Sequence, residues 1–445
     1  WNSPPDGYTG CLMITLPETI LENIRTAGVV GAGGGGFPAH VKLSAKADTV
    51  LINAAECEPL LHKDKELCRA FTEELVSGLA SAMRLVGAAS GIIGIKEKYT
   101  EVIDQVARAL KPGQSVCPLP DVYPAGDEMI LVYHVLGRVV PPGGIPLNVG
   151  AVVLNVETAV NIARAEAGPV TRKFLTVGGA VANPTTFEVP VGITLAECVA
   201  AAGGATIPDA NYIVGGTMMG TLEDDHDALV DKTTGGILIL PSTNPAVARR
   251  RRDWQAMQRI GRSACDQCSF CTELCPRYLL GHPIEPHRAM RSLGFNRVGG
   301  SDVKGTAFCC GCNLCSMYAC PEGLDPREVC WENRAEQLRK GKWVDAPFNE
   351  QRPVNHMANR QAPIKRLMKK LDLTGFRNEG ELAAEALTTK RVGIKLKQHV
   401  GAPCEPAVTV GQRVSAGALV GKLPISEGKP AMGAPVHASI DGTVT

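Results

Sequence analysis

The chain opens with a helix-like apolar pattern and then alternates strand-like apolar runs with polar segments. Apolar residues recur at helical spacing over residues 16–30 (LPETILENIRTAGVV), and strand-like runs follow at 49–55 (TVLINAA) and 151–158 (AVVLNVET). Polar residues stand at or just after the end of each run, where the strands of an open α/β sheet bind ligands. We therefore predict an α/β domain over residues 1–167 whose polar clusters converge on one pocket.

The rest of the chain shows different patterns. Residues 168–243 form short strand-like segments around one helix, which predicts a β-rich domain. Residues 345–390 are rich in Pro, Asn and Lys and predict a linker across the surface, with one basic amphipathic stretch, APIKRLMKKLDL. Residues 391–445 predict short strands joined by glycine turns. Between these segments, residues 249–344 carry most of the cysteines.

Length and composition narrow the functional classes. The 445 residues predict about three domains. The net charge of +1 indicates neither a nucleic acid nor a membrane surface as a partner. The sequence contains no run of about 18 apolar residues, so it predicts no transmembrane helix. The N-terminal stretch WNSPPDGYTG lacks a secretory signal pattern, and because it lacks Met we expect residues ahead of it.

Nine of the 16 cysteines lie between residues 265 and 320. The first four have the spacing C-x2-C-x2-C-x3-C-P of bacterial ferredoxins, in which the fourth cysteine ligates the other of two clusters. The second group, CCGCNLCSMYACP at 309–321, fits the same rule when Cys310 is left out. The crossed pattern predicts two [4Fe-4S] clusters, cluster 1 held by Cys265, Cys268, Cys271 and Cys320, and cluster 2 held by Cys309, Cys312, Cys315 and Cys275. Two zinc sites are the alternative, but zinc usually takes two separated C-x2-C pairs.

A second chemical signal is the glycine-rich stretch GVVGAGGGGFPAHVKL at 28–43. Bare backbone N–H groups and a nearby cation, Lys42, suit a phosphate. Gly31, Gly33 and Gly36 match the pattern G-x-G-x-x-G, although no strand directly precedes them. A flexible surface turn is the alternative.

Four segments, GAGGGGFPAHVKL, NAAECEP, YPAGDE and LNVET, resemble in this order the flavin-binding motifs of the complex I 51-kDa flavoprotein family, and most closely its Rnf electron-transport C subunit. The resemblance implies a Rossmann-like domain that binds FMN and accepts hydride from NADH. The implied FMN contacts are Gly31, Gly33, Gly36, Lys42, Asn53, Tyr123, Gly126, Asp127, Asn155 and Thr158. The implied NADH contacts are Phe37, Glu58 and Glu128. The chain departs from the family at Ala32, where a basic residue is usual, and at Ala55, where an acidic one is usual.

The order of the modules resembles one branch of this family. Residues 168–243 resemble the β-grasp SLBB domain, 249–344 an α-helical dicluster ferredoxin domain, and 391–445 the barrel-sandwich hybrid of biotinyl and lipoyl carriers without its carrier lysine. The barrel-sandwich module precedes the flavin domain in the Rnf C subunit but comes last here. Taken together, this multidomain α/β order resembles the cobalamin reductases of propanediol-utilisation microcompartments.

This resemblance implies an oxidoreductase that passes electrons from NADH through FMN and two clusters to cobalamin, reducing cob(III)alamin and cob(II)alamin towards cob(I)alamin. It implies a bacterial cytoplasmic enzyme within a microcompartment, with an adenosyltransferase, shell proteins and a second copy of the chain as partners. The alternative is an electron-relay subunit of an Rnf-like NADH:ferredoxin oxidoreductase complex. No catalytic side chain is expected, because the cofactors carry the chemistry. For Arg249–Arg252, a solvated helix face and charge compensation for the clusters remain equal alternatives.

Overall fold

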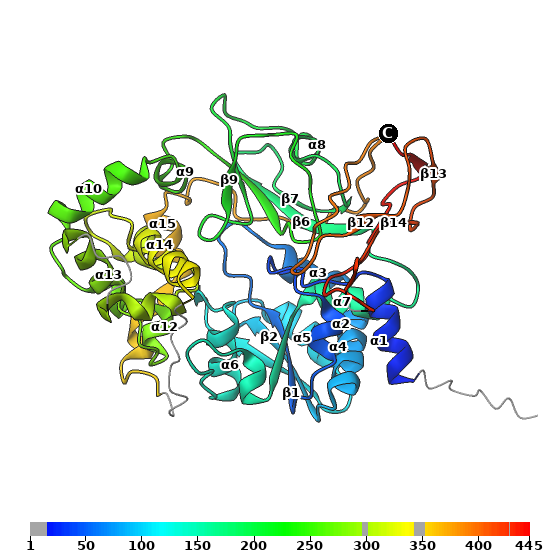
Figure 1. Ribbon diagram of the computed structural model, residues 1–445, viewed down its shortest axis with the longest axis horizontal. Coiled ribbons are helices and arrows are strands. Elements are labelled where there is room, and N and C mark those ends of the chain that lie inside the picture. Colours follow the sequence, from blue (N-terminus) through cyan, green and yellow to red (C-terminus); the bar gives the residue numbers. More distant parts are fainter. Residues whose placement is uncertain (1–15, 296–300, 342–351, 427) are drawn as a thin grey trace, which may run out of the picture.

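The computed structural model describes residues 16–295, 301–341, 352–426 and 428–445. The helical, cysteine-rich region and the C-terminal β module lie at opposite ends of the molecule, with two sheet-containing domains between them (Figure 1). The first residues of the predicted N-terminal domain, and the junction of the cysteine-rich region with the predicted linker, fall outside the described residues. Within the described chain, no helix combines the length and the apolar character needed to cross a membrane.

The N-terminal domain is built on a parallel sheet with the strand order β3-β2-β1-β5. Its strands are β1 (Thr49–Ala54), β2 (Ser90–Lys96), β3 (Gln114–Leu119) and β5 (Ala151–Asn155). Its helices are α1 (Pro17–Thr26), α2 (Ala39–Leu43), α3 (Lys63–Ala70), α4 (Thr72–Val86), α5 (Thr100–Ala109), α6 (Glu128–Leu136) and α7 (Val156–Arg164), with a 3-10 turn η1 (Pro146–Val149). Val50 and Ile52 pack into one apolar core and Leu51 into another on the opposite face. Because both faces are covered, β1 is apolar at nearly every position, as its sequence predicted.

The strand order reverses at β1. The chain passes from β1 to β2 and β3 on one side and then crosses to β5 on the other side. Asn53 and Asn155 are register partners at the carboxyl ends of β1 and β5. Ligands of open α/β sheets bind at such a switch point, so the topology itself places the candidate pocket at these two asparagines.

The second domain is a mixed sheet with the strand order β7-β6-β10-β8-β9. Its elements are β6 (Arg172–Gly179), β7 (Thr185–Pro190), α8 (Leu195–Ala201), β8 (Asn211–Val214), β9 (Thr221–Glu223) and β10 (Gly236–Leu240). The central strands β6 and β10 are parallel, and the other neighbours are antiparallel. One helix on a mixed sheet of short strands agrees with the predicted β-grasp fold.

The cysteine-rich region consists of short helices that end at the cysteine loops. Its helices are α9 (Pro245–Arg250), α10 (Trp254–Ala264), α11 (Phe270–Glu273), α12 (Pro276–Leu279), α13 (Pro286–Ser292) and α14 (Pro326–Arg339), with 3-10 turns η2 (Leu293–Phe295) and η3 (Ser301–Phe308) and a π-helical turn η4 (Cys315–Ala319). Both Cys-Pro dipeptides stand at helix boundaries: Pro276 opens α12 directly after Cys275, and Pro321 follows Cys320 at the end of η4. Proline ends one helix or begins another here, because it lacks an N–H donor.

The described part of the predicted linker has many exposed residues, but its middle is packed against other domains. It contains η5 (Met357–Arg360), β11 (Ala362–Pro363) and α15 (Ile364–Lys370), and β11 pairs with β4 (Val122–Tyr123) of the N-terminal domain. Ile364, Leu367 and Met368 share an apolar core with Leu314 of the second cysteine loop. These apolar residues recur at helical spacing, so the stretch is an amphipathic helix that buries one face.

The C-terminal module is a small β sandwich. Its strands are β12 (Glu405–Pro406), β13 (Arg413–Val414), β14 (Leu419–Lys422), β15 (Ile425–Ser426), β16 (Lys429–Pro430), β17 (Val436–His437) and β18 (Gly442–Thr443). They form a sheet β12-β14-β17 and the pairs β13-β18 and β15-β16. Although it ends the chain, the module lies beside α1 and α2 near the start of the described chain (Figure 1).

Candidate active site

The glycine-rich loop is a closed turn with an open tip. Gly31 N donates to Phe37 O at 2.9 Å, and Gly36 N donates to Gly31 O at 3.1 Å, so the two ends of the turn are tied together. A Cβ added to Gly34 or Gly35 would meet no other atom within 4 Å. The tip therefore leaves bare backbone N–H groups accessible, as a phosphate cradle requires.

The loop lies over the N-terminus of α7. Ala32 N donates to Thr158 Oγ1 at 2.9 Å, and a Cβ on Gly33 would stand 3.4 Å from Asn155 Cβ. Asn155 caps the helix by accepting a hydrogen bond from Glu157 N at 3.0 Å. A helix N-terminus carries partial positive charge and attracts phosphate. This donor set fits the phosphate of a flavin mononucleotide.

The other flavin-like motifs meet beside this loop. Lys42 Nζ donates to Val153 O at 2.9 Å and lies 3.4 Å from Glu128 Oε1. Asn53 Nδ2 donates to Gly126 O at 2.7 Å, which joins the end of β1 to the YPAGDE segment. Four segments far apart in the sequence thus converge at the switch point.

A buried charge network below the loop was not anticipated from the sequence. The amines of Lys63 and Lys173 lie 3.1 and 3.4 Å from Ala32 O, and both lysines pair with Glu157. Burial lowers the pKa of Lys173 to about 8. Burial alone would raise the pKa of Glu157, but Lys173 and Lys63 outweigh it and hold the pKa below its ordinary value. Cationic groups therefore reach the loop at Ala32, although this position itself has lost the family's basic side chain.

The predicted NADH contacts differ in their surroundings, because one binds the second domain and two remain accessible. Both carboxylate oxygens of Glu58 accept backbone N–H groups of Met218 and Met219 in the second domain, at 2.8 Å each. Burial raises the pKa of Glu58 to about 7. Phe37 is half-buried and Glu128 is exposed. Glu58 thus serves a domain contact, whereas Phe37 and Glu128 remain accessible near the glycine-rich loop.

The two cysteine loops share one backbone conformation. Gln267 and Ser269, which flank Cys268, have φ of 62° and 66°, and Gly311 and Asn313, which flank Cys312, have φ of 71° and 63°. Left-handed residues turn their N–H groups into a concave array that favours anions. The match aligns Cys268 with Cys312, so Cys310 corresponds to Asp266 and not to a cysteine of the first loop. This alignment supports the register in which Cys310 is the surplus cysteine.

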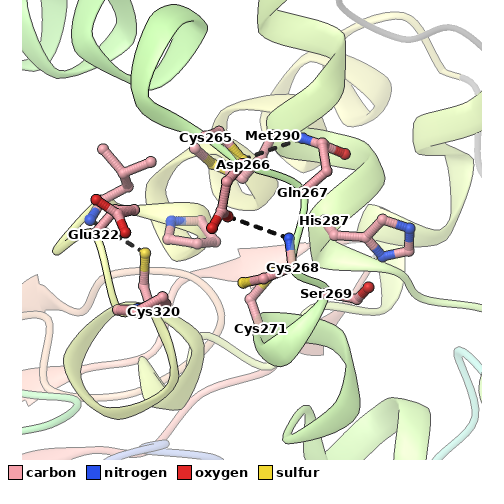
Figure 2. A pocket seen from close by; sticks show the side chains of 13 residues that line it. Cys265, Asp266, Gln267, Cys268, Ser269, Cys271, His287, Met290, Cys320 and Glu322 are labelled. Carbon is pink, nitrogen blue, oxygen red and sulfur yellow. Dashed lines mark hydrogen bonds between the residues drawn. The ribbon is translucent and has the colours of Figure 1, made fainter.

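The four cysteines predicted for cluster 1 lie together. Cys265, Cys268, Cys271 and Cys320 line one pocket, although Cys320 comes from the second loop (Figure 2). Cys275 is buried with Cys309 in one apolar cluster, which also contains Cys320 and Cys330. Burial raises the pKa of Cys275 to about 12, with Cys310 and Cys309 adding to the shift, so its thiolate requires a compensating cation. Which cysteine ligates which cluster remains a prediction.

The cysteine sets do not resemble a single-ion site. Among the described residues, no three His, Cys, Asp or Glu side chains converge as ligands of one metal ion do. Thiolates around a cubane of eight iron and sulfur atoms stand farther apart than those around one zinc ion. The preference for iron–sulfur clusters over zinc therefore rests on the cysteine spacing.

Two predicted flavin contacts bind the cysteine-rich region. Tyr123 Oη donates to Cys312 O at 2.6 Å, and Arg277 forms a two-pronged ion pair with Asp127 at 2.5 and 2.8 Å. Tyr123 and Arg277 are buried, and Asp127 also caps α6 through Met129 N. The sequence did not single out Arg277; its position directly after Cys275-Pro276 was the available signal.

The arginine run 249–252 has a third role that neither sequence alternative described. Arg250 Nη2 donates to Thr217 O and Gly220 O at 2.9 Å each, and Arg252 Nη1 donates to Gly323 O at 2.8 Å. The run therefore joins the second domain to the cysteine-rich region through backbone carbonyls.

Family models match the chain in the order that the motifs predicted. They are the Nuo51 FMN-binding domain at residues 24–164, the SLBB domain at 174–222, the 4Fe-4S dicluster domain at 264–325 and the RnfC barrel sandwich hybrid domain at 378–445. The predicted fold class is confirmed.

Two curated relatives are similar over almost their whole length. The cobalamin reductases PduS of Salmonella typhimurium and Citrobacter freundii are each 44% identical over 432 residues, which is 96% of this chain and 94% of theirs. The chain belongs to the cobalamin reductase PduS family. With its FMN-binding and 4Fe-4S domains, this PduS-family chain is an oxidoreductase of flavin and iron–sulfur electron transfer, as the sequence predicted.

More distant similarities cover less of the chain. The C subunit of the Na(+)-translocating ferredoxin:NAD(+) oxidoreductase complex of Acetobacterium woodii is 35% identical over 271 residues, 59% of this chain and 58% of its own length. Among solved structures, an NAD+-reducing [NiFe]-hydrogenase in the H2-reduced state overlaps with a TM-score of 0.49 and 21% identity, over 75% of this chain and 64% of that one.

Proposed function

We propose that this PduS-family protein reduces the cobalt of cobalamin with electrons from NADH. The observation that carries the proposal is the direct joining of the flavin motifs to a cysteine loop by Tyr123–Cys312 and Asp127–Arg277. A flavin pocket and clusters that share a buried interface form one electron path. The relatives named cobalamin reductase supply the acceptor.

The position of each residue in the site indicates its proposed role. Backbone N–H groups of Gly33–Gly35, the N-terminus of α7 and Lys42 would hold the FMN phosphate, and Asn53 and Gly126 would border the ring. When bound, FMN accepts the two electrons of a hydride and releases them singly. Phe37 and Glu128 would orient the nicotinamide nucleotide, because their side chains remain accessible. Glu58 would act indirectly, by fixing the second domain against β1.

Two [4Fe-4S] clusters with the crossed ligand sets complete the proposal. Such clusters carry single electrons at potentials that reach down to about −700 mV, a range suited to forming cob(I)alamin. NADH gives up two electrons and one proton as NAD+ forms, so two cob(II)alamin molecules are reduced for each NADH. The domains 1–167, 168–243, 249–344 and 391–445 are proposed as the functional units.

Anaerobic purification of the full chain tests the proposal. We expect one FMN and about eight iron atoms per chain, NADH oxidation, and reduction of cob(III)alamin and cob(II)alamin, followed by absorbance. Lys42→Ala should lower FMN retention while leaving the iron content unchanged, because Lys42 lies in the flavin site, where it contacts Val153 O and Glu128. Unchanged flavin content in this variant would contradict the phosphate cradle.

A second candidate function is an electron-relay subunit like the Rnf C subunit. The 35% identity to the C subunit of an oxidoreductase complex and the barrel-sandwich module favour it. If the purified protein oxidises NADH but reduces cobalamin only after a membrane partner is added, the relay function replaces the reductase.

We propose the bacterial cytoplasm and a microcompartment as the setting, with shell proteins, an adenosyltransferase and a second copy of the chain as partners. The resemblance to cobalamin reductases of propanediol-utilisation microcompartments supports the setting. Co-sedimentation of the tagged full chain with purified microcompartments tests it, and recovery of the chain only in the supernatant would contradict it.

A further inference from the structure

The glycine-rich loop is held at its first end from outside the N-terminal domain. Lys232, on the turn before β10, donates its Nζ to Gly28 O at 2.7 Å and to Pro435 O at 3.1 Å. Its side chain is only 2% exposed. One buried ammonium thus joins the flavin domain, the SLBB domain and the C-terminal module.

The other end of the loop is held by the C-terminal module itself. Val400 N donates to Gly36 O at 2.9 Å. Gly36 has φ of +61°, and a Cβ there would stand 3.0 Å from Thr233 Cγ2 and 3.3 Å from His399 Cα. The loop and the module therefore approach each other as closely as glycine permits.

The module is well anchored where it touches the loop. Gln398 Oε1 accepts Lys232 N at 3.0 Å, Gly393 N donates to Gly192 O at 2.9 Å, and Ser439 Oγ donates to Val191 O at 2.5 Å. Three contacts with the SLBB domain thus fix the module beside the loop. Both ends of the glycine-rich stretch are held, and only its tip remains open.

We propose that the C-terminal barrel-sandwich module is a structural part of the flavin site, and that Lys232 is the positioning residue that connects it to the glycine-rich loop. The inference rests on the proposed flavin site. A loop with four consecutive glycines loses much conformational entropy when it becomes ordered. Holding its two ends before FMN arrives removes most of that cost from binding.

The same contacts fix the place of the C-terminal module in the folded chain. It lies beside the segment that directly follows α1, near the start of the flavin domain.

Lys232→Met in the full chain tests the inference. The change removes the bonds to Gly28 O and Pro435 O but keeps an apolar side chain of similar length in the buried position. We expect FMN to bind about tenfold more weakly to the flavin-free protein, measured by flavin fluorescence. Amide hydrogen exchange in peptides covering 28–38 should become faster in the flavin-free state, while the iron content stays unchanged.

Lys395→Met is the matched control. Lys395 joins the same two domains through Asp231 at 3.2 Å, but it is 45% exposed and this pair does not involve the loop. This variant should bind FMN and exchange amide hydrogens like the parent protein. If Lys232→Met behaves like Lys395→Met in both measurements, the inference is overturned.

Gly36→Ala provides the second test if Lys232→Met loses its iron and therefore its fold. The added Cβ should push the loop from the module and give the same faster exchange at 28–38, with weaker FMN binding and intact clusters. Normal exchange and normal binding in this variant would reject the inference. Failure of the proposed function is separate, because it would appear as absence of FMN binding in the parent protein.

Discussion

The two cysteine loops have the same backbone conformation but opposite surroundings. In the first loop Cys265 and Cys268 are half-buried and the adjacent Phe270 is 46% exposed. In the second loop Cys309, Cys312 and Cys315 are all buried, and Tyr123 from the flavin domain binds the backbone of Cys312. The backbone conformation is therefore a local property that both loops share, whereas their position relative to the flavin domain is decided by packing. The comparison predicts that electrons enter through the second loop and leave through the first.

The largest expected effect comes from removing a cysteine of one loop or the other and comparing how the remaining cluster is reduced. Cys312→Ser should remove the cluster nearer the flavin, so NADH should no longer reduce the remaining cluster, although dithionite should. Cys268→Ser should remove the outer cluster but leave the inner one reducible by NADH. Iron analysis and electron paramagnetic resonance after each reductant measure both results. Equal reduction of the remaining cluster by NADH in the two variants would reject the assigned order.

Arg277→Met should have the next largest effect, because it leaves the buried carboxylate of Asp127 without its partner. Loss of one member of a buried pair costs about 3–5 kcal/mol. We expect a lower midpoint in chemical unfolding and a faster loss of contact between the flavin domain and α12, which follows the first cysteine loop. Arg360→Met is the control, since its pair with Glu273 is partly exposed and such pairs contribute less than about 1 kcal/mol. Equal effects of the two changes would show that the interface does not depend on Arg277.

Tyr123→Phe tests the contact between the flavin domain and the second loop. It removes the donor to Cys312 O and leaves a buried carbonyl unpaired, which costs about 1–3 kcal/mol. We expect lower stability and slower reduction of the inner cluster by NADH in stopped-flow absorbance, with iron and FMN contents unchanged. A parent-like reduction rate would show that this bond does not support electron entry.

Cys310→Ser should have the smallest effect. Cys310 holds the place that Asp266 holds in the first loop, and no ligand is expected at either position. Iron and sulfide contents should equal those of the parent protein. Loss of about four iron atoms per chain would mean that the register of the second loop is wrong.

The sequence predicted the elements whose chemistry is local. Two-residue spacing between cysteines confines three thiolates to one loop, and the left-handed residues around Cys268 and Cys312 agree with that spacing. The apolar run at 49–55 predicted the strand β1, and the glycine-rich stretch predicted bare backbone N–H groups that suit a phosphate. Each of these patterns lies within a few residues, so the backbone alone largely decides it.

The packing of α15 inside the predicted linker was not predicted, although residues 374–390 are largely exposed. The helical spacing of Ile364, Leu367 and Met368 was visible, but the surface that receives them comes from two other domains. The same limit applies to Tyr123 and Asp127, which resembled flavin contacts and also bind the cysteine-rich region. A sequence motif shows which side chains are present, but it does not show which other residues they contact.

By itself, then, the sequence determined the cysteine spacing, the glycine-rich stretch and the strands, because these depend on a few neighbouring residues. The order of the modules and the class of chemistry followed from the resemblance of its motifs to a known family. Only the tertiary structure decided that Lys63 and Lys173 meet beneath the glycine-rich loop, that Arg277 reaches Asp127, and that the last module of the chain lies beside the first helix. These partners are separated by 110 to more than 350 residues. Such contacts depend on the burial of charged groups and on close approach of the backbone, which arise only when the domains pack together. No local sequence pattern therefore predicts them.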